Sequence, residues 1–200
     1  MNLIYVMDPM CSWCYAFQPQ LEAFLTAQPQ AKVSWIMGGL APDTSEPMPQ
    51  QQRQAIAGYW RVIEQKTSVT FNHDFWSKNI PFRSTYPACR AVIAAEQLRS
   101  NSSLAMVKAI QKAYYQEAQN PSLADTLVEC AVSIGLDSTE FTEVLNSPLT
   151  QQSFEQHLSL SQQLQVQGFP ALFYIDGQQR AYPLTYGYCE ASALDAALPS

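Results

Sequence analysis

Hydrophobic and polar positions follow two different periods along the chain, and the change of period divides it into three parts. The apolar run from Leu3 to Met7 is typical of a strand, and Asp8-Pro9 ends it because proline disfavours a helical conformation in the preceding residue. From Cys11 onward the apolar positions lie three and four residues apart, which predicts a helix kinked at Pro19. Residues 32–37 predict a second strand. This β-α-β opening implies a parallel pair of strands joined by a right-handed crossover.

The middle of the chain has helical periodicity throughout. We find no run with strand periodicity between residues 42 and 165. Ser84 or Thr85 is placed to cap one helix, and Ser122 with Asp125 three residues later resembles a capping box for another. The predicted helices cover residues 54–65, 88–98, 104–114 and 123–134, and Asp137 with Glu140 opens a further short one.

Strand periodicity returns near the C-terminus. Gly168-Phe169-Pro170 precedes the apolar run Ala171–Ile175, and Asp176-Gly177 separates that run from residues 178–184. An Asp-Gly pair between two strand-like runs is a strong hairpin signal. A helix over residues 190–198 is predicted to close the chain.

Composition and charge exclude several classes of protein. Hydrophobic residues make up 47% of the 200 and charged residues 14%, so the chain can form a core and is not disordered. The net charge is −6 and no stripe of lysine and arginine is present, which argues against nucleic acid as a partner. No apolar run reaches the roughly 18–20 residues of a membrane span, and the N-terminus has no signal-peptide features. Five cysteines are an odd number, which suits a reducing compartment, so we expect a cytoplasmic enzyme without membrane contact.

The motif Cys11-Ser12-Trp13-Cys14 lies where the first predicted strand gives way to the first predicted helix. Two cysteines at this spacing in a first helical turn can close a disulfide with little rearrangement. Cys11 would lie next to the unsatisfied amides and the positive dipole end of the helix, which stabilise a thiolate and lower its pKa. We therefore expect Cys11 to be the attacking sulfur and Cys14, one turn further in, to be the more buried, resolving thiol.

Other chemistry at a cysteine pair needs residues that this sequence lacks. A c-type haem site requires a histidine directly after the second cysteine, where this chain has Tyr15. A structural zinc site usually combines two such pairs, and the chain has neither a second C-x-x-C nor a pair of closely spaced histidines. We expect no metal. Two helical cysteines without a chemical role remain the other interpretation.

The order of elements, together with three short motifs, resembles the thioredoxin fold and, within it, the DsbA-like family of thiol-disulfide oxidoreductases. The similarity is to its cytoplasmic, protein-disulfide-isomerase type. The motifs are Asp8 to Tyr15, Pro19 and Gly168 to Pro170. The resemblance implies an α/β, thioredoxin-like fold with an all-helical insertion. We expect the thioredoxin-like domain at residues 1–41 and 150–200, and the insertion domain at residues 42–149.

The resemblance also implies roles for individual residues. Cys11 and Cys14 would form the catalytic dithiol, and Pro170 would follow a cis peptide bond and lie against it. Trp13, Phe169 and Pro170 are the expected substrate-binding residues. The implied partners are protein or peptide thiols and disulfides, or glutathione as a co-substrate. No cofactor is expected, because the dithiol itself carries the two electrons.

Two departures leave alternatives open. Ser12-Trp13 replaces the Pro-His of the strongly oxidising periplasmic enzyme, so we expect a less extreme pKa at Cys11. Kappa-class glutathione transferases have a similar architecture but normally use a serine at the position of Cys11, which favours redox chemistry here. A glutathione-dependent transferase or isomerase is the alternative function, and a non-catalytic binding module is another.

Several further residues are candidates on weaker grounds. Cys89 and Cys130 have apolar neighbours, which predicts small buried side chains. Cys189 has no partner motif, and neither histidine is placed by its spacing as a ligand or base. Four aromatic residues are candidates to line a pocket between the insertion and the dithiol, although their helical spacing is also typical of a core: Trp60, Tyr86, Tyr114 and Tyr115.

Overall fold

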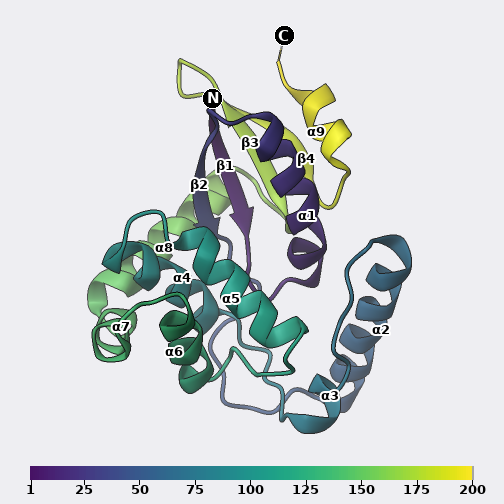
Figure 1. Cartoon of the computed structure of the whole chain (residues 1–200), viewed down its shortest axis with the longest axis vertical. Coiled ribbons are helices and arrows are strands. Elements are labelled where there is room, and N and C mark those ends of the chain that lie inside the picture. Colours follow the sequence, from purple (N-terminus) through teal and green to yellow (C-terminus); the bar gives the residue numbers. More distant parts are fainter. Residues whose placement is uncertain (200) are drawn as a thin grey trace.

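The computed structural model describes residues 1–199 and builds them around a four-stranded sheet (Figure 1). The strands are β1 (Asn2–Met7), β2 (Lys32–Met37), β3 (Ala171–Ile175) and β4 (Ala181–Tyr186), and they lie in the order β2-β1-β3-β4. β1 pairs in parallel with β2 and antiparallel with β3, which in turn pairs antiparallel with β4. The predicted parallel pair and the predicted hairpin are both confirmed.

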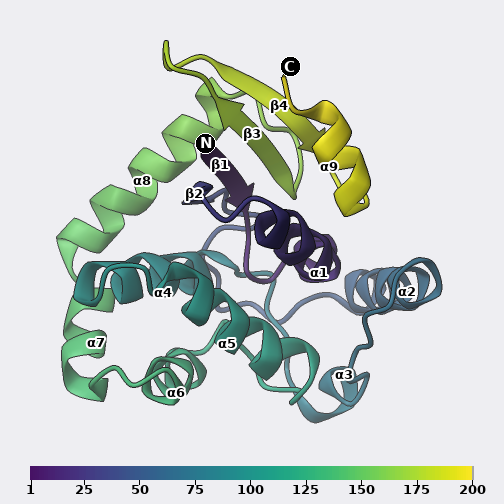
Figure 2. The same cartoon turned by 45° about the horizontal axis from the view of Figure 1, so that its top comes forward.

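Helices cover both faces of the sheet (Figures 1 and 2). On one face α1 (Ser12–Ala27) packs beside α9 (Ala191–Ala197), and on the other face lies α8 (Pro148–Gln163). Side chains of a strand alternate between the two faces, so β1 contributes Leu3 and Tyr5 to the core under α1, and Val6 to the smaller core under α8. Pro19 lies within α1, and the helix continues past it, as the sequence predicted.

Between β2 and β3 the chain is helical, as predicted. The helices before α8 are α2 (Gln50–Lys66), α3 (Phe75–Lys78), α4 (Tyr86–Leu98), α5 (Ser103–Tyr115), α6 (Ala124–Ser133) and α7 (Ser138–Leu145). The short helix α3 had no signal in the sequence pattern, and α2 begins four residues earlier than expected. None of the helices in residues 1–199 is both long and apolar enough to cross a membrane.

One hydrophobic core runs from the sheet into this helical part. Tyr5 and Phe17 belong to the same buried cluster as Trp60 and Phe141. The Trp60 ring on α2 stacks on Phe71 with the ring centroids 4.9 Å apart, and it also contacts aromatic rings of α3 and α5. The division of the chain into two domains stays a prediction, and the two parts share this buried cluster.

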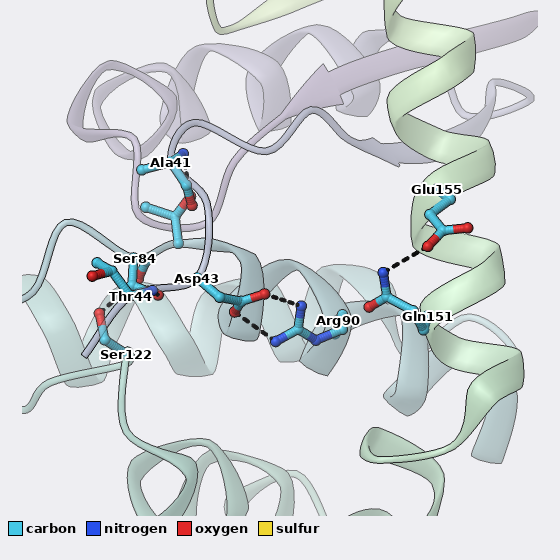
Figure 3. Close-up of polar contacts among 9 residues, drawn as sticks. Ala41, Asp43, Thr44, Ser84, Arg90, Ser122, Gln151 and Glu155 are labelled. Carbon is cyan, nitrogen blue, oxygen red and sulfur yellow. Dashed lines mark hydrogen bonds and ion pairs between the residues drawn. The ribbon is translucent and has the colours of Figure 1, made fainter. Parts of the chain in front are cut away.

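Polar contacts tie the loop after β2 to the start of α4 (Figure 3). The carboxylate of Asp43 accepts two hydrogen bonds from the guanidinium of Arg90, at 2.8 and 2.9 Å. The amide of Thr44 donates to the hydroxyl of Ser84 at 3.4 Å. These contacts hold the loop against the helix that borders the site described below.

The cap predicted at the start of α6 differs from what the structure contains, whereas the one predicted at the start of α7 is present. Ser122 lies one residue before the N-cap of α6, and its hydroxyl donates to the carbonyl of Ser84 at 2.6 Å (Figure 3). Leu123 is the N-cap of α6 and forms no side-chain cap, so the predicted capping box with Asp125 is wrong. Asp137 does cap α7, where its carboxylate accepts hydrogen bonds from two backbone amides of the first turn.

Candidate active site

The two cysteines of the C-x-x-C motif lie at the junction of β1 and α1. Cys11 is the N-cap residue of α1 and has an extended backbone (φ −81°, ψ 116°), and Cys14 lies in the first turn. Both are free thiols. Cys14 is completely buried, whereas Cys11 keeps 8% of its surface exposed. The more buried position of Cys14, expected from the sequence, is confirmed.

Hydrogen bonds and burial separate the pKa values of the two thiols. A hydrogen bond from the Cys14 side chain lowers the pKa of Cys11, and the amides of Cys14 and Trp13 add to this effect against the opposing effect of burial. Burial raises the pKa of Cys14 well above its ordinary value, and its hydrogen bond with Cys11 raises it further. Cys11 is therefore the thiol that ionises first, which is the requirement for an attacking sulfur.

The segment before β3 lies against the dithiol. The Phe169–Pro170 peptide bond is cis, as predicted. The thiol of Cys11 points at the carbonyl of Phe169, with Sγ and O 3.7 Å apart, although the two residues are 158 positions apart in the sequence. On the far side, the carbonyl of Pro170 accepts a 2.7 Å hydrogen bond from the amide of Gly187. The backbone of this segment is thus fixed between the end of β4 and Cys11.

The ring of Phe169 packs directly over Gly38. A β-carbon added at position 38 would overlap the ring carbons of Phe169. Only glycine therefore fits at the end of β2 while Phe169 keeps its position. The sequence pattern could not show this close approach, because it joins two segments that are far apart along the chain.

A buried carboxylate beside the dithiol was missed by the sequence analysis. Asp8 follows β1 and is completely buried. Its Oδ1 accepts a 2.8 Å hydrogen bond from the amide of Met10, and its Oδ2 accepts one of 2.7 Å from the amide of Leu40. Burial raises the pKa of Asp8, and these hydrogen bonds partly oppose the rise. The available signal was an acidic residue directly after a buried apolar strand.

Two further side chains donate hydrogen bonds to this carboxylate, one from the N-cap of α4 and one from within α4. The hydroxyl of Thr85 donates to Oδ2 of Asp8 at 2.6 Å, and the thiol of Cys89 donates to the same oxygen at 3.4 Å. Thr85 occupies the N-cap of α4, as the sequence allowed, but its side chain does not cap the helix. Cys89 is buried, as predicted, and in addition has a polar partner. The charge of Asp8 raises the pKa values of both Cys11 and Cys14.

A cavity of about 250 Å³ opens beside Cys11. Its walls come from the start of α1, from α2, from the loop before α4 and from Phe169. Met10 and Met48 contribute thioether groups, and Trp13 contributes an indole that packs against Tyr188 with the ring centroids 5.8 Å apart. A larger hollow of about 920 Å³ follows β2 and α8, but it includes neither cysteine of the motif. Of these two cavities, the one of about 250 Å³ is therefore the one that adjoins the dithiol.

The four candidate aromatic residues divide into two pairs. Trp60 and Tyr114 line the cavity beside Cys11. Tyr86 packs instead against Phe154, with the ring centroids 4.8 Å apart, and Tyr115 is fully buried in the core. All four have helical spacing in the sequence, so only the packing of the insertion on the sheet could distinguish the residues that line the cavity from those that do not.

The remaining candidates lie apart from the dithiol. Nε2 of His73 lies 3.0 Å from a carboxylate oxygen of Glu64, and Nδ1 of His157 accepts a 3.1 Å hydrogen bond from the amide of Met37. Cys130 is buried and Cys189 is half-buried. Within residues 1–199 no group of three or more histidine, cysteine, aspartate or glutamate side chains is placed to hold a metal ion.

Solved structures with a similar fold include proteins described in redox terms. A protein from Nitrosomonas europaea described as a "putative protein disulfide isomerase" superposes with a TM-score of 0.88, at 28% identity, over 98% of this chain and 94% of that chain. The cytosolic disulfide reductase DsbM from Pseudomonas aeruginosa superposes with a TM-score of 0.78, at 26% identity, over 92% of this chain and 89% of that one. DsbM has also been solved with GSH, and that structure gives a TM-score of 0.77.

The curated relatives carry a different description. The ClpXP adapter protein SpxH of Halalkalibacterium halodurans is 27% identical over 146 residues, which is 70% of this chain and 47% of the relative. SpxH of Bacillus subtilis is 19% identical over 193 residues, 94% of this chain and 64% of the relative. The chain thus spans about half the length of the first relative and under two thirds of the second.

The α/β fold, with its helical insertion between the strands and its mixed sheet, is thioredoxin-like. It holds a C-x-x-C pair at the start of α1 and a cis proline opposite that pair. The family model of the DsbA-like thioredoxin domain matches residues 2–188, and the chain belongs to that family.

Proposed function

We propose that this chain is a thiol-disulfide oxidoreductase that exchanges disulfides with protein, peptide or glutathione substrates through Cys11 and Cys14. The observation that carries the proposal is the contrast between the two thiols. Cys11 has a lowered pKa and keeps 8% of its surface exposed, whereas Cys14 has a raised pKa and is completely buried. A thiolate is the nucleophile in disulfide exchange, so this contrast supports attack by Cys11 and resolution by Cys14.

The reaction has two steps. The Cys11 thiolate attacks one sulfur of a substrate disulfide, which forms a mixed disulfide and releases the other substrate sulfur as a thiolate. Cys14 then loses its proton and attacks the sulfur of Cys11, which releases the second substrate thiolate and leaves the Cys11–Cys14 disulfide. Two electrons pass from the protein to the substrate, and the same steps run in reverse when the oxidised protein meets a dithiol.

Trp13, Phe169 and Pro170 are the proposed substrate-binding residues. Trp13 and Phe169 line the cavity at Cys11. The position of the Phe169 carbonyl against Cys11 supports a role in holding the backbone of an extended substrate segment, as an edge strand does. Pro170 has no amide hydrogen, and its carbonyl is already bound to Gly187, so its proposed contribution is the contact surface of its ring.

The proposed partners and location follow from the relatives. DsbM is described as a cytosolic disulfide reductase and has been solved with GSH. These descriptions support glutathione as a co-substrate and a cytoplasmic location for this chain, as the sequence led us to expect. No cofactor enters the proposed reaction, because the dithiol carries the electrons.

Trapping of mixed disulfides tests the assignment of the two thiols. Cys14→Ser removes the resolving thiol, so it is expected to accumulate covalent adducts with substrates. Cys11→Ser removes the attacking thiol and is expected to accumulate none. Cys189→Ser is the matched control, since it removes a half-buried thiol outside the motif, and its adducts should equal those of the wild type. Equal trapping by Cys14→Ser and Cys11→Ser, or by neither, would remove the proposed roles.

A second candidate function is protein binding without turnover, and it is favoured by the description of SpxH as a ClpXP adapter. The two functions differ in their dependence on the thiols. Reduction of insulin and of glutathione disulfide, measured beside glutathione conjugation, is expected to be present in the wild type and lost in Cys11→Ala. A wild type that conjugates glutathione but reduces no disulfide would favour the glutathione-dependent transferase, the alternative raised by the sequence. A wild type with neither activity would favour protein binding without turnover.

A further inference from the structure

The cavity beside Cys11 contains one side chain with a permanent charge. Its other lining residues carry apolar, aromatic, hydroxyl or thiol groups, whereas Arg83, in the loop before α4, contributes a guanidinium. A charged group among methionine and aromatic side chains is unusual, because removing a charge from water is costly unless a partner compensates it. We therefore ask which group compensates the charge of Arg83.

Arg83 has no such partner within residues 1–199. The arginine ion pairs of the described chain are those of Arg90 with Asp43 and of Arg180 with Asp176. Arg53 and Arg99 donate hydrogen bonds to nearby oxygens. Arg83 is half-buried and is found in neither group.

Arg83 and Tyr114 both line the cavity. Burial raises the pKa of Tyr114, and the positive charge of the Arg83 guanidinium opposes that rise. It is not needed to activate the thiol, because hydrogen bonds from Cys14 and Trp13 account for the lowered pKa of Cys11. Arg83 thus lines the space beside Cys11 in which a substrate would lie.

We propose that Arg83 binds a carboxylate of the substrate, so that the preferred substrates are thiols and disulfides with a carboxylate close to the sulfur. This rests on the proposed exchange reaction at Cys11. A guanidinium presents paired N–H donors whose geometry matches the two oxygens of a carboxylate. A cavity of about 250 Å³ holds a small group beyond the reacting sulfur rather than a folded segment. The carboxylate can belong to a small thiol or to an acidic residue beside a cysteine in a peptide.

Three small disulfides of similar size and different charge test this proposal. They are 3,3′-dithiodipropionate, which is anionic, bis(2-hydroxyethyl) disulfide, which is neutral, and cystamine, which is cationic. Each oxidises the reduced protein to the Cys11–Cys14 disulfide and is itself reduced to two thiols, so no further reductant is needed. The second-order rate constant of this single turnover is measured from the thiol released and compared between wild type and variant for each disulfide.

Arg83→Gln is expected to lower the rate constant for dithiodipropionate at least about tenfold, which corresponds to roughly 1.4 kcal/mol. It should leave the rate constant for the neutral disulfide within about twofold and should not lower that for cystamine. Arg83→Lys keeps the charge, so its rate constant for dithiodipropionate should fall less than that of Arg83→Gln. Arg61→Gln is the matched control, because Arg61 is exposed on α2 and outside the cavity, so the same change of net charge should alter none of the three.

The possible outcomes separate the carboxylate site from the exchange reaction itself. Loss of rate for all three disulfides in equal proportion, or for none, would overturn the role of Arg83 and leave the exchange function standing. A wild type that none of the three oxidises would overturn both. Two peptide disulfides that differ only in glutamate or glutamine next to the cysteine distinguish the sources of the carboxylate. Sensitivity of this pair to Arg83→Gln supports an acidic peptide, and insensitivity, with dithiodipropionate affected, supports a small thiol.

Discussion

The hydroxyl of Thr85 donates a 2.6 Å hydrogen bond to Oδ2 of Asp8, although the two residues are 77 positions apart in the sequence. The same hydroxyl accepts a 3.0 Å hydrogen bond from the amide of Ala41. It therefore connects the end of β1, the loop after β2 and the start of α4. All three residues are buried, so none of these groups can exchange its partner for water without the structure opening.

Replacement of Thr85 tests how much this connection contributes to stability. Thr85→Val keeps the shape of the side chain but leaves Asp8 with one donor fewer and the amide of Ala41 without an acceptor. We expect the free energy of unfolding to fall by about 1–3 kcal/mol, as for a buried group that loses its partner. Thr85→Ser keeps the hydroxyl and should retain most of the stability. Denaturant unfolding of both variants gives the comparison.

Asp43→Asn is the control for that series, because it weakens the Asp43–Arg90 pair at the surface of the same loop (Figure 3). Exposed ion pairs contribute about 0–1 kcal/mol. A loss in Asp43→Asn as large as that in Thr85→Val would show that the whole loop, rather than the buried hydroxyl, determines the effect.

Asp8→Asn should change the acidity of the dithiol as well as the stability. The negative charge of Asp8 raises the pKa of Cys11, so removing it should lower that pKa. The asparagine NH₂ group would face a backbone N–H of Met10 or Leu40, both of which donate to Asp8, and we expect a loss of about 1–3 kcal/mol. Titration of the thiolate absorbance measures the first effect. A pKa at Cys11 that stays the same or rises would contradict the electrostatic role of Asp8.

The stability lost in Asp8→Asn should depend on pH. Burial raises the pKa of Asp8 in the folded state above its unfolded value, so the folded protein binds the proton more tightly. The stability that this group contributes is present below the unfolded pKa and is lost as the pH rises through the folded-state pKa. The difference between wild type and variant should therefore shrink as the pH rises from about 4. A difference that grows over this range would reverse the assigned direction of the shift.

The dependence of Cys11 on Cys14 can be tested with two substitutions of different hydrogen-bonding capacity. Cys14→Ala removes the hydrogen bond that is the main cause of the lowered pKa of Cys11, so burial should then raise that pKa. Cys14→Ser keeps a donor and should retain part of the effect. The rate of alkylation of Cys11, followed by mass spectrometry as the pH is raised, should have a higher midpoint in Cys14→Ala. Equal midpoints would mean that the helix N-terminus alone sets the acidity.

Gly38→Ala tests the packing that positions Phe169. The added methyl group overlaps the Phe169 ring, so the ring and the carbonyl next to Cys11 must move. We expect disulfide exchange to slow several-fold, while the pKa of Cys11 is unchanged. Phe169→Leu provides space for the methyl group, and the double variant should be less impaired than the sum of the single ones. Additive effects would indicate that the two residues act independently.

The sequence pattern was sufficient for the features that depend on neighbouring residues. The strands, the first helix continuing past Pro19, the cysteines at its start and the hairpin all follow from local periodicity and turn chemistry. The cis bond before Pro170 was predicted from the family resemblance, to which the short motif Gly168 to Pro170 contributes. These features lie within a few positions of the residues that signal them.

The features that the pattern could not supply join distant segments. Leu40, Thr85 and Cys89 surround Asp8 only because β1, the loop after β2 and α4 meet in the folded chain. Ser122 has the spacing of a capping residue, but α6 begins one residue later than expected, and the Ser122 hydroxyl donates to the carbonyl of Ser84. The tertiary fold decides which of several hydrogen-bond partners a side chain uses, and a local sequence pattern does not contain that information.

The pairing of β1 with β3 places Val6 opposite Ala171, so strands from the two ends of the chain are neighbours in the sheet. Synthesis on the ribosome delivers the N-terminal part first. The cysteine pair is therefore made before the strand and the carbonyl that cover Cys11, which follow 158 positions later. Until that segment is made, the growing chain carries two thiols that it does not cover, and contacts so distant in sequence also form slowly. The redox state of the compartment in which the chain is made thus acts on Cys11 and Cys14 before the fold can protect them.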